Sequence, residues 1–313
     1  MRNFDELFDA VRERPVKRVV AAAAADPTVV RALSEARHRG LAEPVLVGPA
    51  DEIADLAREH GQGIRPEDVI DEADPIKAAN IAVKMVHDGE ADIVMKGHIH
   101  TDDFLRAVLN KEHGLRAGVR MSHVFILDYR TENRLLFITD AAMNIAPDLE
   151  AKADIVLNAV GLAHIFGFDE PKVACLAAVE LLNPAMPATV DATCLHTMYE
   201  RHQFSPKCII DGPFALDNAV SVAAAKHKRI EGPVAGLADI LLVPDIEAGN
   251  MLAKSFVYFA GGSLAGMVVG AKAPVVLTSR ADSAGSKLAS VAAAVYVADV
   301  ARDVSVKIGK VHY

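Results

Sequence analysis

The chain has 313 residues, of which 51% are hydrophobic and 24% are charged, and its formal net charge is −9. This length and composition allow a large buried core and exclude a chain that is intrinsically disordered. The chain is acidic overall and has no block of five or six basic residues. It therefore lacks the positively charged patch that is expected of a protein that binds nucleic acid or an anionic membrane.

The first residues and the cysteines together predict a cytoplasmic protein. Residues 1–15 are charged and lack the apolar stretch of a signal peptide. Cys175, Cys194 and Cys208 form no CxxC pair and are odd in number, so neither a disulfide framework nor a zinc site is expected. We expect these cysteines to be core residues in a reducing compartment.

Strands and helices alternate from the start of the chain. Two helices are predicted over 26–40 and 74–89, because each segment begins with Asp-Pro and ends at glycine, the residue types of an N-cap, a first helical position and a helix end. The apolar runs 16–22, 44–48 and 91–96 are continuous rather than alternating, which is typical of buried parallel strands.

The rest of the chain continues this alternation and predicts a doubly wound α/β architecture, in which ligands bind where strands end and helices begin. The uncharged stretch 255–271 is shorter than the ~20 residues of a membrane helix, and glycine at every fourth position predicts a buried helix there. Strands are predicted at 123–128, 135–139, 172–178, 208–211, 239–243 and 274–278, and helices at 148–166, 188–202, 247–259 and 285–299.

Polar or glycine-bearing segments follow several of the predicted strands. The signatures GxxxxGK[ST], GxGxxG and GxSxG do not occur. His98 and His100 form an HxH pair without further spaced ligands, so we predict no metal site. The strand-end segments are MKGHIHTDDFLR at 95–106, IIDGPFALD at 209–217, LLVPDIEAGNMLAK at 241–254 and VVLTSRADSAGSKLAS at 275–290.

Four blocks resemble the signature blocks of the phosphate acetyltransferase and phosphate butyryltransferase family: KGHIHTDDFLRAV, DGPFALDNAVS, ADILLVPDIEAGNMLAK and LTSRADS…KLAS. The similarity runs from about residue 17 to 298. It implies a two-domain, doubly wound three-layer α/β sandwich of the isocitrate/isopropylmalate dehydrogenase-like kind. It also implies a discontinuous first lobe, 1–143 plus 269–313, a second lobe, 144–268, and an active site in the cleft between them.

The activity implied by the resemblance is reversible transfer of a short acyl group, acetyl or butyryl, between coenzyme A and inorganic phosphate, by direct thiol attack in a ternary complex. Coenzyme A is then a substrate, and no permanently bound cofactor, nucleic acid or membrane partner is expected. The family also implies a homo-oligomer, a dimer or larger.

Two other classes of function stay open at this point. A dehydrogenase of the related fold, oxidising a hydroxy acid with NAD and a divalent metal, would need a cluster of aspartates that the strand ends do not supply. A non-catalytic protein that binds coenzyme A or phosphate is compatible with the altered acidic position described next.

The resemblance assigns catalytic roles to Ser279, which would hydrogen-bond the reacting centre, and to Arg280, which would stabilise the developing oxyanion. A salt-bridged Arg280 in an ordinary turn is the alternative. Acetyl members of the family carry an acidic residue seven positions after this serine, where this chain has Ser286. Asp282 is the nearest substitute and fits two roles, a general base for the thiol and an N-cap of the following helix.

The remaining matches are candidate substrate-binding residues. Arg106 matches a candidate ligand of phosphate or acyl phosphate, and a solvated helix arginine is the alternative. Lys254 fits either a substrate contact or a structural salt bridge with Asp245. Gly97 sits at a strand end, where glycine permits close backbone approach. The full set is Lys96, Gly97, Thr101, Arg106, Asp245, Gly249, Asn250, Lys254, Ser283 and Lys287.

Overall fold

The computed structural model describes residues 1–60, 63–303 and 310–312, and its contacts divide the chain into two compact units. The N-terminal unit comprises Asn3–Val119 and Ser263–Ser305, and the central unit comprises Arg120–Gly262 with residues from both chain ends. These boundaries differ from the predicted ones, 143/144 and 268/269. The first boundary differs because β6 (Arg134–Thr139) pairs with β10 (Ile240–Leu242) of the central unit and with its neighbour β5 (Ser122–Tyr129). The second differs because β11 (Ser263–Val269) pairs with β12 (Val275–Val276) of the N-terminal unit.

The N-terminal unit is built on a sheet with the strand order β3-β2-β1-β4-β12-β11, in which β11 runs antiparallel to β12 and the other pairs are parallel. Its strands are β1 Lys17–Ala22, β2 Ala42–Gly48, β3 Val69–Asp71, β4 Ile93–Lys96, β11 Ser263–Val269 and β12 Val275–Val276. Its helices are α1 Phe4–Arg12, α2 Pro27–His38, α3 Ala50–His60, α4 Pro75–His87, α5 Thr101–Val108 and α11 Ala284–Asp303.

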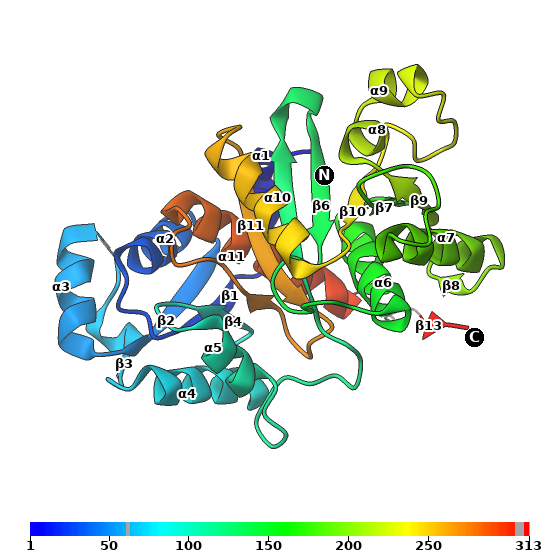
Figure 1. Ribbon diagram of the computed structural model, residues 1–313. Coiled ribbons are helices and arrows are strands. Elements are labelled where there is room, and N and C mark those ends of the chain that lie inside the picture. Colours follow the sequence, from blue (N-terminus) through cyan, green and yellow to red (C-terminus); the bar gives the residue numbers. More distant parts are fainter. Residues whose placement is uncertain (61–62, 304–309, 313) are drawn as a thin grey trace. The chain divides into compact units, whose positions relative to one another are not determined.

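Helices cover both faces of this sheet, which explains why the central residues of β1, β2 and β4 are apolar and buried. α2 and α11 contact each other on one face, and α4 and α5 contact each other on the other face (Figure 1). α2 and α4 begin as predicted, because Asp26 and Asp74 each accept hydrogen bonds from two backbone N–H groups of the first turn. Gly40 and Gly89 follow these helices with φ of 68° and 81°, a conformation that favours glycine.

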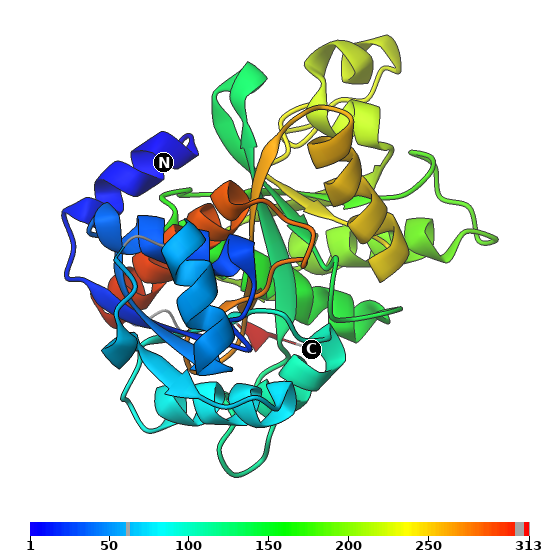
Figure 2. The same ribbon diagram turned by 90° about the vertical axis from the view of Figure 1, so that its left-hand side faces the viewer.

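The central unit is built on a sheet with the strand order β5-β6-β10-β7-β9, in which only the β5–β6 pair is antiparallel. α6 and α7 contact each other on one face, whereas α10 packs on β6 and α8 on β7 (Figure 2). The strands are β5 Ser122–Tyr129, β6 Arg134–Thr139, β7 Lys172–Leu176, β9 Ile209–Phe214 and β10 Ile240–Leu242, and a short pair joins β8 Phe204–Ser205 to β13 Lys310–Val311. The helices are α6 Leu149–Ile165, α7 Pro187–Glu200, α8 Leu216–Val220, α9 Val222–His227 and α10 Ile246–Tyr258.

The helix predicted at 255–271 is wrong. Residues 255–258 end α10, and Ser263–Val269 form the strand β11, which is buried over most of its length. A short apolar run is compatible with either a buried strand or a buried helix, so glycine spacing alone could not decide. By length and composition, the window Ala284–Ala301 of α11 could cross a membrane; 67% of this window is buried, and α11 packs on α1, α2 and β11 as a core helix.

Candidate active site

The candidate site residues of the N-terminal unit follow three adjacent parallel strands. β4 lies between β1 and β12 in the sheet, so the segments that follow these strands meet at one edge. This edge carries Lys96 at the end of β4, Asp26 at the start of α2 and the segment 279–287, which comprises the turn before α11 and the first residues of that helix.

Gly97 allows the backbone after β4 to lie directly against the end of β1. Its N–H donates to the carbonyl oxygen of Ala22 at 2.9 Å, and the His98 N–H donates to that of Ala23 at 2.7 Å. A Cβ atom on residue 97 would lie 2.5 Å from the first of these oxygens and 2.4 Å from the second. No side chain fits at this position, which explains the glycine after Lys96.

Gly97→Ala is therefore expected to destabilise the fold by ~1–3 kcal/mol, the usual cost of overpacking a core. Urea unfolding of the purified variant measures this. Gly285→Ala is the matched control, because its Cβ would meet nothing closer than 3.7 Å, in the first turn of α11, and should leave stability unchanged or raise it by ~1 kcal/mol. Equal stability of the two variants would contradict the close approach.

A hydrogen-bonded turn, residues 279–282, presents Arg280. Oδ2 of Asp282 accepts the Ser279 N–H at 2.7 Å, and the Asp282 N–H donates to the Ser279 carbonyl at 3.2 Å. Nζ of Lys287 donates to the carbonyl oxygens of Ser279 and Asp282 at 3.0 and 2.8 Å. Arg280 is exposed, and its guanidinium makes no ion pair within the described part of the chain. The salt-bridged alternative for Arg280 is therefore wrong.

The N-cap of α11 is Ser283 rather than Asp282. Oγ of Ser283 accepts the Ser286 N–H at 3.1 Å, as an N-cap side chain does. The cap interpretation of Asp282 is therefore wrong: one of its oxygens fastens the 279–282 turn, and the other accepts no hydrogen bond from residues 1–60, 63–303 or 310–312. Ser286, at the family's acidic position, is buried in the first turn of α11, so Asp282 is the available carboxylate.

Lys96 is a buried cation without a counter-ion. Lys96 is only 2% exposed, and its Nζ donates to the Gly97 carbonyl oxygen at 3.3 Å. The pKa of Lys96 is lowered to about 8, chiefly by burial and also by the positive charges of Arg280 and Lys287, while the carboxylates of Asp282 and Asp26 oppose this shift. We call these five residues, Lys96, Arg280, Lys287, Asp26 and Asp282, the strand-edge cluster.

Lys287 and Asp26 in the strand-edge cluster are already hydrogen-bonded to other groups. Burial also lowers the pKa of Lys287, whose protons go to the two carbonyls of the 279–282 turn. Burial alone would raise the pKa of Asp26, but hydrogen bonds from Thr28 and Val29 outweigh it and lower that pKa. His98 Nδ1 lies 3.6 Å from Asp26 Oδ2. Lys96 and Arg280 are thus the cluster's cations with donors to spare.

The buried charge of Lys96 costs stability in a pH-dependent way. A lysine in the unfolded chain has a pKa near 10.4, so the folded protein holds fewer protons than the unfolded chain between about pH 8 and 10.5. The cost is complete below pH 8 and fades as the pH rises through this window. Lys96→Met is expected to raise the free energy of unfolding at pH 7 by up to ~3 kcal/mol, and by less at pH 10. Urea unfolding at both pH values measures this, and an equal change at both would contradict it.

Arg106 and Thr101 lie on α5. Thr101 begins the helix and is partly buried, whereas the Arg106 side chain is 77% exposed and pairs with Asp103 at 2.6 Å. This is the geometry of a solvated helix arginine, and its contacts link it to Asp103 rather than to the strand-edge cluster. A phosphate contact by Arg106 stays a prediction.

The candidate residues of the central unit follow β10, which is the neighbour of β6 in its sheet. Asp245 is the N-cap of α10 and accepts the Ala248 N–H at 2.8 Å. A Cβ on Gly249 would lie 3.0 Å from Ala141, so glycine lets α10 approach the segment after β6. Nδ2 of Asn250 donates weakly to the Ala141 carbonyl at 3.4 Å. These residues therefore organise the carboxyl edge of the central sheet.

Lys254 is exposed and forms no ion pair with Asp245, so the predicted alternative of a structural bridge is wrong.

The sequence interpretation missed Asp140, which is buried directly after β6. Its carboxylate accepts the N–H groups of His123 and of residues 142–144, and thereby shapes the loop that faces α10. An aspartate immediately after a buried strand was the available signal.

The cysteines are unsuited to nucleophilic chemistry. Cys175 and Cys208 are buried, and all three are free. Burial raises the pKa of the Cys175 thiol and raises that of Cys208 to about 12. A thiol of this kind holds its proton at neutral pH, which agrees with the prediction of Cys175 and Cys208 as core residues, whereas Cys194 is half-buried. Within the described residues, no group of three or more metal-ligating side chains gathers.

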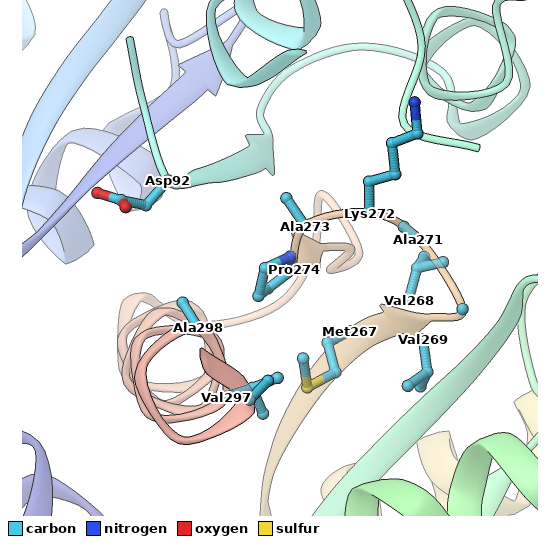
Figure 3. Close-up of a pocket in the computed structure, with 12 residues that line it drawn as sticks. Asp92, Met267, Val268, Val269, Ala271, Lys272, Ala273, Pro274, Val297 and Ala298 are labelled. Carbon is cyan, nitrogen blue, oxygen red and sulfur yellow. The ribbon is translucent and has the colours of Figure 1, made fainter. Parts of the chain in front are cut away.

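A separate cavity of about 250 Å³ lies at the opposite edge of the N-terminal sheet, beside the residues that precede β4 and β12. Figure 3 shows Met267, Pro274 and Val297 along it, and the Lys272 side chain extending away from them. The cavity is mostly apolar and contains none of the motif residues, so we do not take it as the active site.

Comparison with known proteins identifies the class of this fold. The crystal structure of a branched-chain phosphotransacylase from Enterococcus faecalis V583 superposes with a TM-score of 0.79 at 33% identity, over 90% of this chain and 99% of that one. The predicted two-domain α/β fold class is thereby confirmed. The family model for phosphate acetyl/butaryl transferase matches residues 56–295.

Curated relatives agree. A phosphate butyryltransferase from Clostridium beijerinckii is 47% identical over 95% of this chain and 98% of its own length. A phosphate acetyltransferase from Rhizobium meliloti is 44% identical over 94% of this chain and 93% of its own length. The chain belongs to the phosphate acetyl/butyryl transferase family, as the sequence blocks predicted.

Proposed function

We propose that this protein transfers a short acyl group, acetyl or butyryl, reversibly between coenzyme A and inorganic phosphate. The observation that carries the proposal within this family is the strand-edge cluster, where a rigid turn presents the unpaired Arg280 beside the buried ammonium of Lys96. Both substrates are anions, and unpaired cations at a strand edge are suited to bind them.

The reaction needs a proton acceptor and an oxyanion donor. A thiol with a pKa near 8.5 must lose its proton before its sulfur attacks the acyl-phosphate carbonyl. The free carboxylate oxygen of Asp282 takes that proton, the carbon–sulfur bond forms, and the carbonyl oxygen becomes an oxyanion that Arg280 stabilises. The carbon–oxygen bond to phosphate then breaks, and phosphate leaves with the electron pair. The reverse reaction retraces these steps, and no acyl-enzyme forms.

The two other functions are less well supported. A metal-dependent dehydrogenase would need a cluster of carboxylate ligands, and the described residues bring none together. A non-catalytic binding protein would have no need for a carboxylate oxygen left free beside Arg280. We also propose that the protein is cytoplasmic, which the free cysteines support. We further propose that it forms a homo-oligomer, which light scattering of the purified protein would test.

One assay separates the three functions. Purified protein is mixed with acetyl-CoA or butyryl-CoA and inorganic phosphate, with and without EDTA, while thioester absorbance is followed. Phosphate-dependent thioester loss that survives EDTA supports acyl transfer. NAD reduction with a hydroxy acid supports the dehydrogenase, and ligand binding without turnover supports the non-catalytic protein; either result would overturn the proposal.

A further inference from the structure

The buried ammonium of Lys96 lacks an anion. A charged group taken out of water is costly unless it is paired and hydrogen-bonded. Lys96 has one long hydrogen bond, to the carbonyl of the next residue, and no carboxylate within ion-pair distance among the residues that the structure describes. Its remaining N–H donors are free for a ligand.

Two carboxylates lie near Lys96, and neither forms an ion pair with it in the described chain. From the 279–282 turn, Asp282 uses Oδ2 to hold the Ser279 N–H. From the start of α2, Asp26 uses Oδ1 for the backbone N–H groups of Thr28 and Val29 and for the Thr28 hydroxyl. Each carboxylate thus uses one oxygen to hold the backbone, and neither lies within ion-pair distance of the Lys96 ammonium.

The remaining charges near Lys96 are positive. Lys287 from α11 donates hydrogen bonds to the two carbonyl oxygens of the turn, and Arg280 has no partner within the described chain. His98, which adds positive charge only when protonated, neighbours Asp26. Three cations face two carboxylates, so the strand-edge cluster carries an excess of one positive charge and has free donors on Lys96 and Arg280.

We propose that Lys96 anchors the phosphate group: its ammonium, together with the Arg280 guanidinium, binds oxygens of inorganic phosphate and of the phosphoryl group of acyl phosphate. This inference rests on the proposed function and names which substrate the buried lysine serves. A compact ammonium acts on phosphate as a point charge, and a guanidinium adds a planar pair of donors. Coenzyme A requires no contact with Lys96 in this arrangement.

Anchoring a dianion changes the protonation of Lys96. Without ligand, its pKa is about 8 under the combined influence of burial, Arg280, Lys287, Asp282 and Asp26. A bound dianion favours the ammonium and raises this pKa. Phosphate binding near pH 8 therefore takes up a proton, and phosphate affinity falls as the pH rises above 8.

Steady-state kinetics first test whether Lys96 binds the phosphate group. Lys96→Met is expected to raise KM for phosphate ~10–100-fold at pH 7, the value of one hydrogen bond to a charged group, while KM for butyryl-CoA stays within about twofold. Lys84→Met is the matched control, because Lys84 is an exposed lysine of α4 in the same unit and pairs with Asp88. An unchanged KM for phosphate, or an equal rise in both KM values, would overturn the anchor.

Calorimetry tests it without turnover. Inorganic phosphate is titrated into the full-length protein at pH 8 in two buffers with different heats of ionisation, which gives the number of protons taken up. We expect about half a proton more for wild type than for Lys96→Met, because a group at its pKa is half protonated. Equal proton uptake in the two proteins would contradict the anchor. The kinetic comparison still decides if phosphate binds too weakly for calorimetry.

These readouts separate the anchor from the proposed function. Wild-type protein that binds phosphate through Lys96 but never consumes a thioester would retain the anchor and refute acyl transfer. Wild-type protein that transfers acyl groups while Lys96→Met keeps its KM for phosphate would retain acyl transfer and refute the anchor. Lys96→Met is expected to fold at least as stably as wild type, so misfolding should not obscure either result.

Discussion

Arg280→Ala is expected to lower kcat by ~10²–10³-fold, the loss seen when one oxyanion donor is removed. The melting temperature should barely change, because the guanidinium makes no ion pair in the described structure and the 279–282 turn is held by Asp282 and Lys287 instead. We therefore expect the exposed side chain to contribute to the reaction rather than to the fold. Initial rates with butyryl-CoA and saturating phosphate, together with a thermal melt, measure both effects.

Arg280→Lys provides the matched comparison, since it keeps the charge and loses the planar pair of donors. We expect it to recover part of the lost rate. A folded Arg280→Ala variant with a kcat near that of wild type would remove Arg280 from the mechanism.

Asp282→Asn is expected to lower kcat by ~10²–10⁴-fold, the contribution of a general base. An asparagine keeps an oxygen that can accept the Ser279 N–H, so the turn and the melting temperature should be preserved. It loses the proton acceptor on the second oxygen. The rate should therefore recover as the pH approaches the thiol pKa, near 8.5, where coenzyme A ionises unaided.

Asp282→Ala separates the two roles of this carboxylate. It removes the base and the bond to the Ser279 N–H together, so it should be as inactive as the asparagine variant and also less stable by ~1 kcal/mol. An active Asp282→Asn variant beside a destabilised Asp282→Ala variant would reduce Asp282 to a structural residue. The thiol would then have to be activated by the positive charge of Arg280 and Lys96.

The helices with explicit end signals were predictable from local residues. Asp-Pro and glycine marked both ends of α2 and α4 because capping and the left-handed conformation are set by neighbours in the sequence. Short or irregular elements were not predictable in this way. β3 has three residues at the sheet edge, and β11 is an apolar run whose periodicity fits a helix equally well.

The sequence motifs of the candidate site were predictable, but the arrangement of its charged side chains was not. The blocks containing Lys96 and Arg280 were recognised, and the run 91–96 predicted a buried strand. Nothing local indicates that Lys96 has no counter-ion or that it lies beside Arg280. Those properties depend on β4 and β12 lying side by side, although they are far apart in the sequence. The same limit applied to Asp282, whose oxygen reaches Ser279 instead of capping α11.

The most direct test of acyl transfer is phosphorus NMR of the EDTA-treated protein with butyryl-CoA and inorganic phosphate. We expect an acyl-phosphate resonance to grow as the thioester disappears, in equal amounts, and to shrink again when coenzyme A is added. Thioester loss without any acyl-phosphate resonance, or a phosphate resonance that never changes, would contradict transfer between coenzyme A and phosphate by this protein.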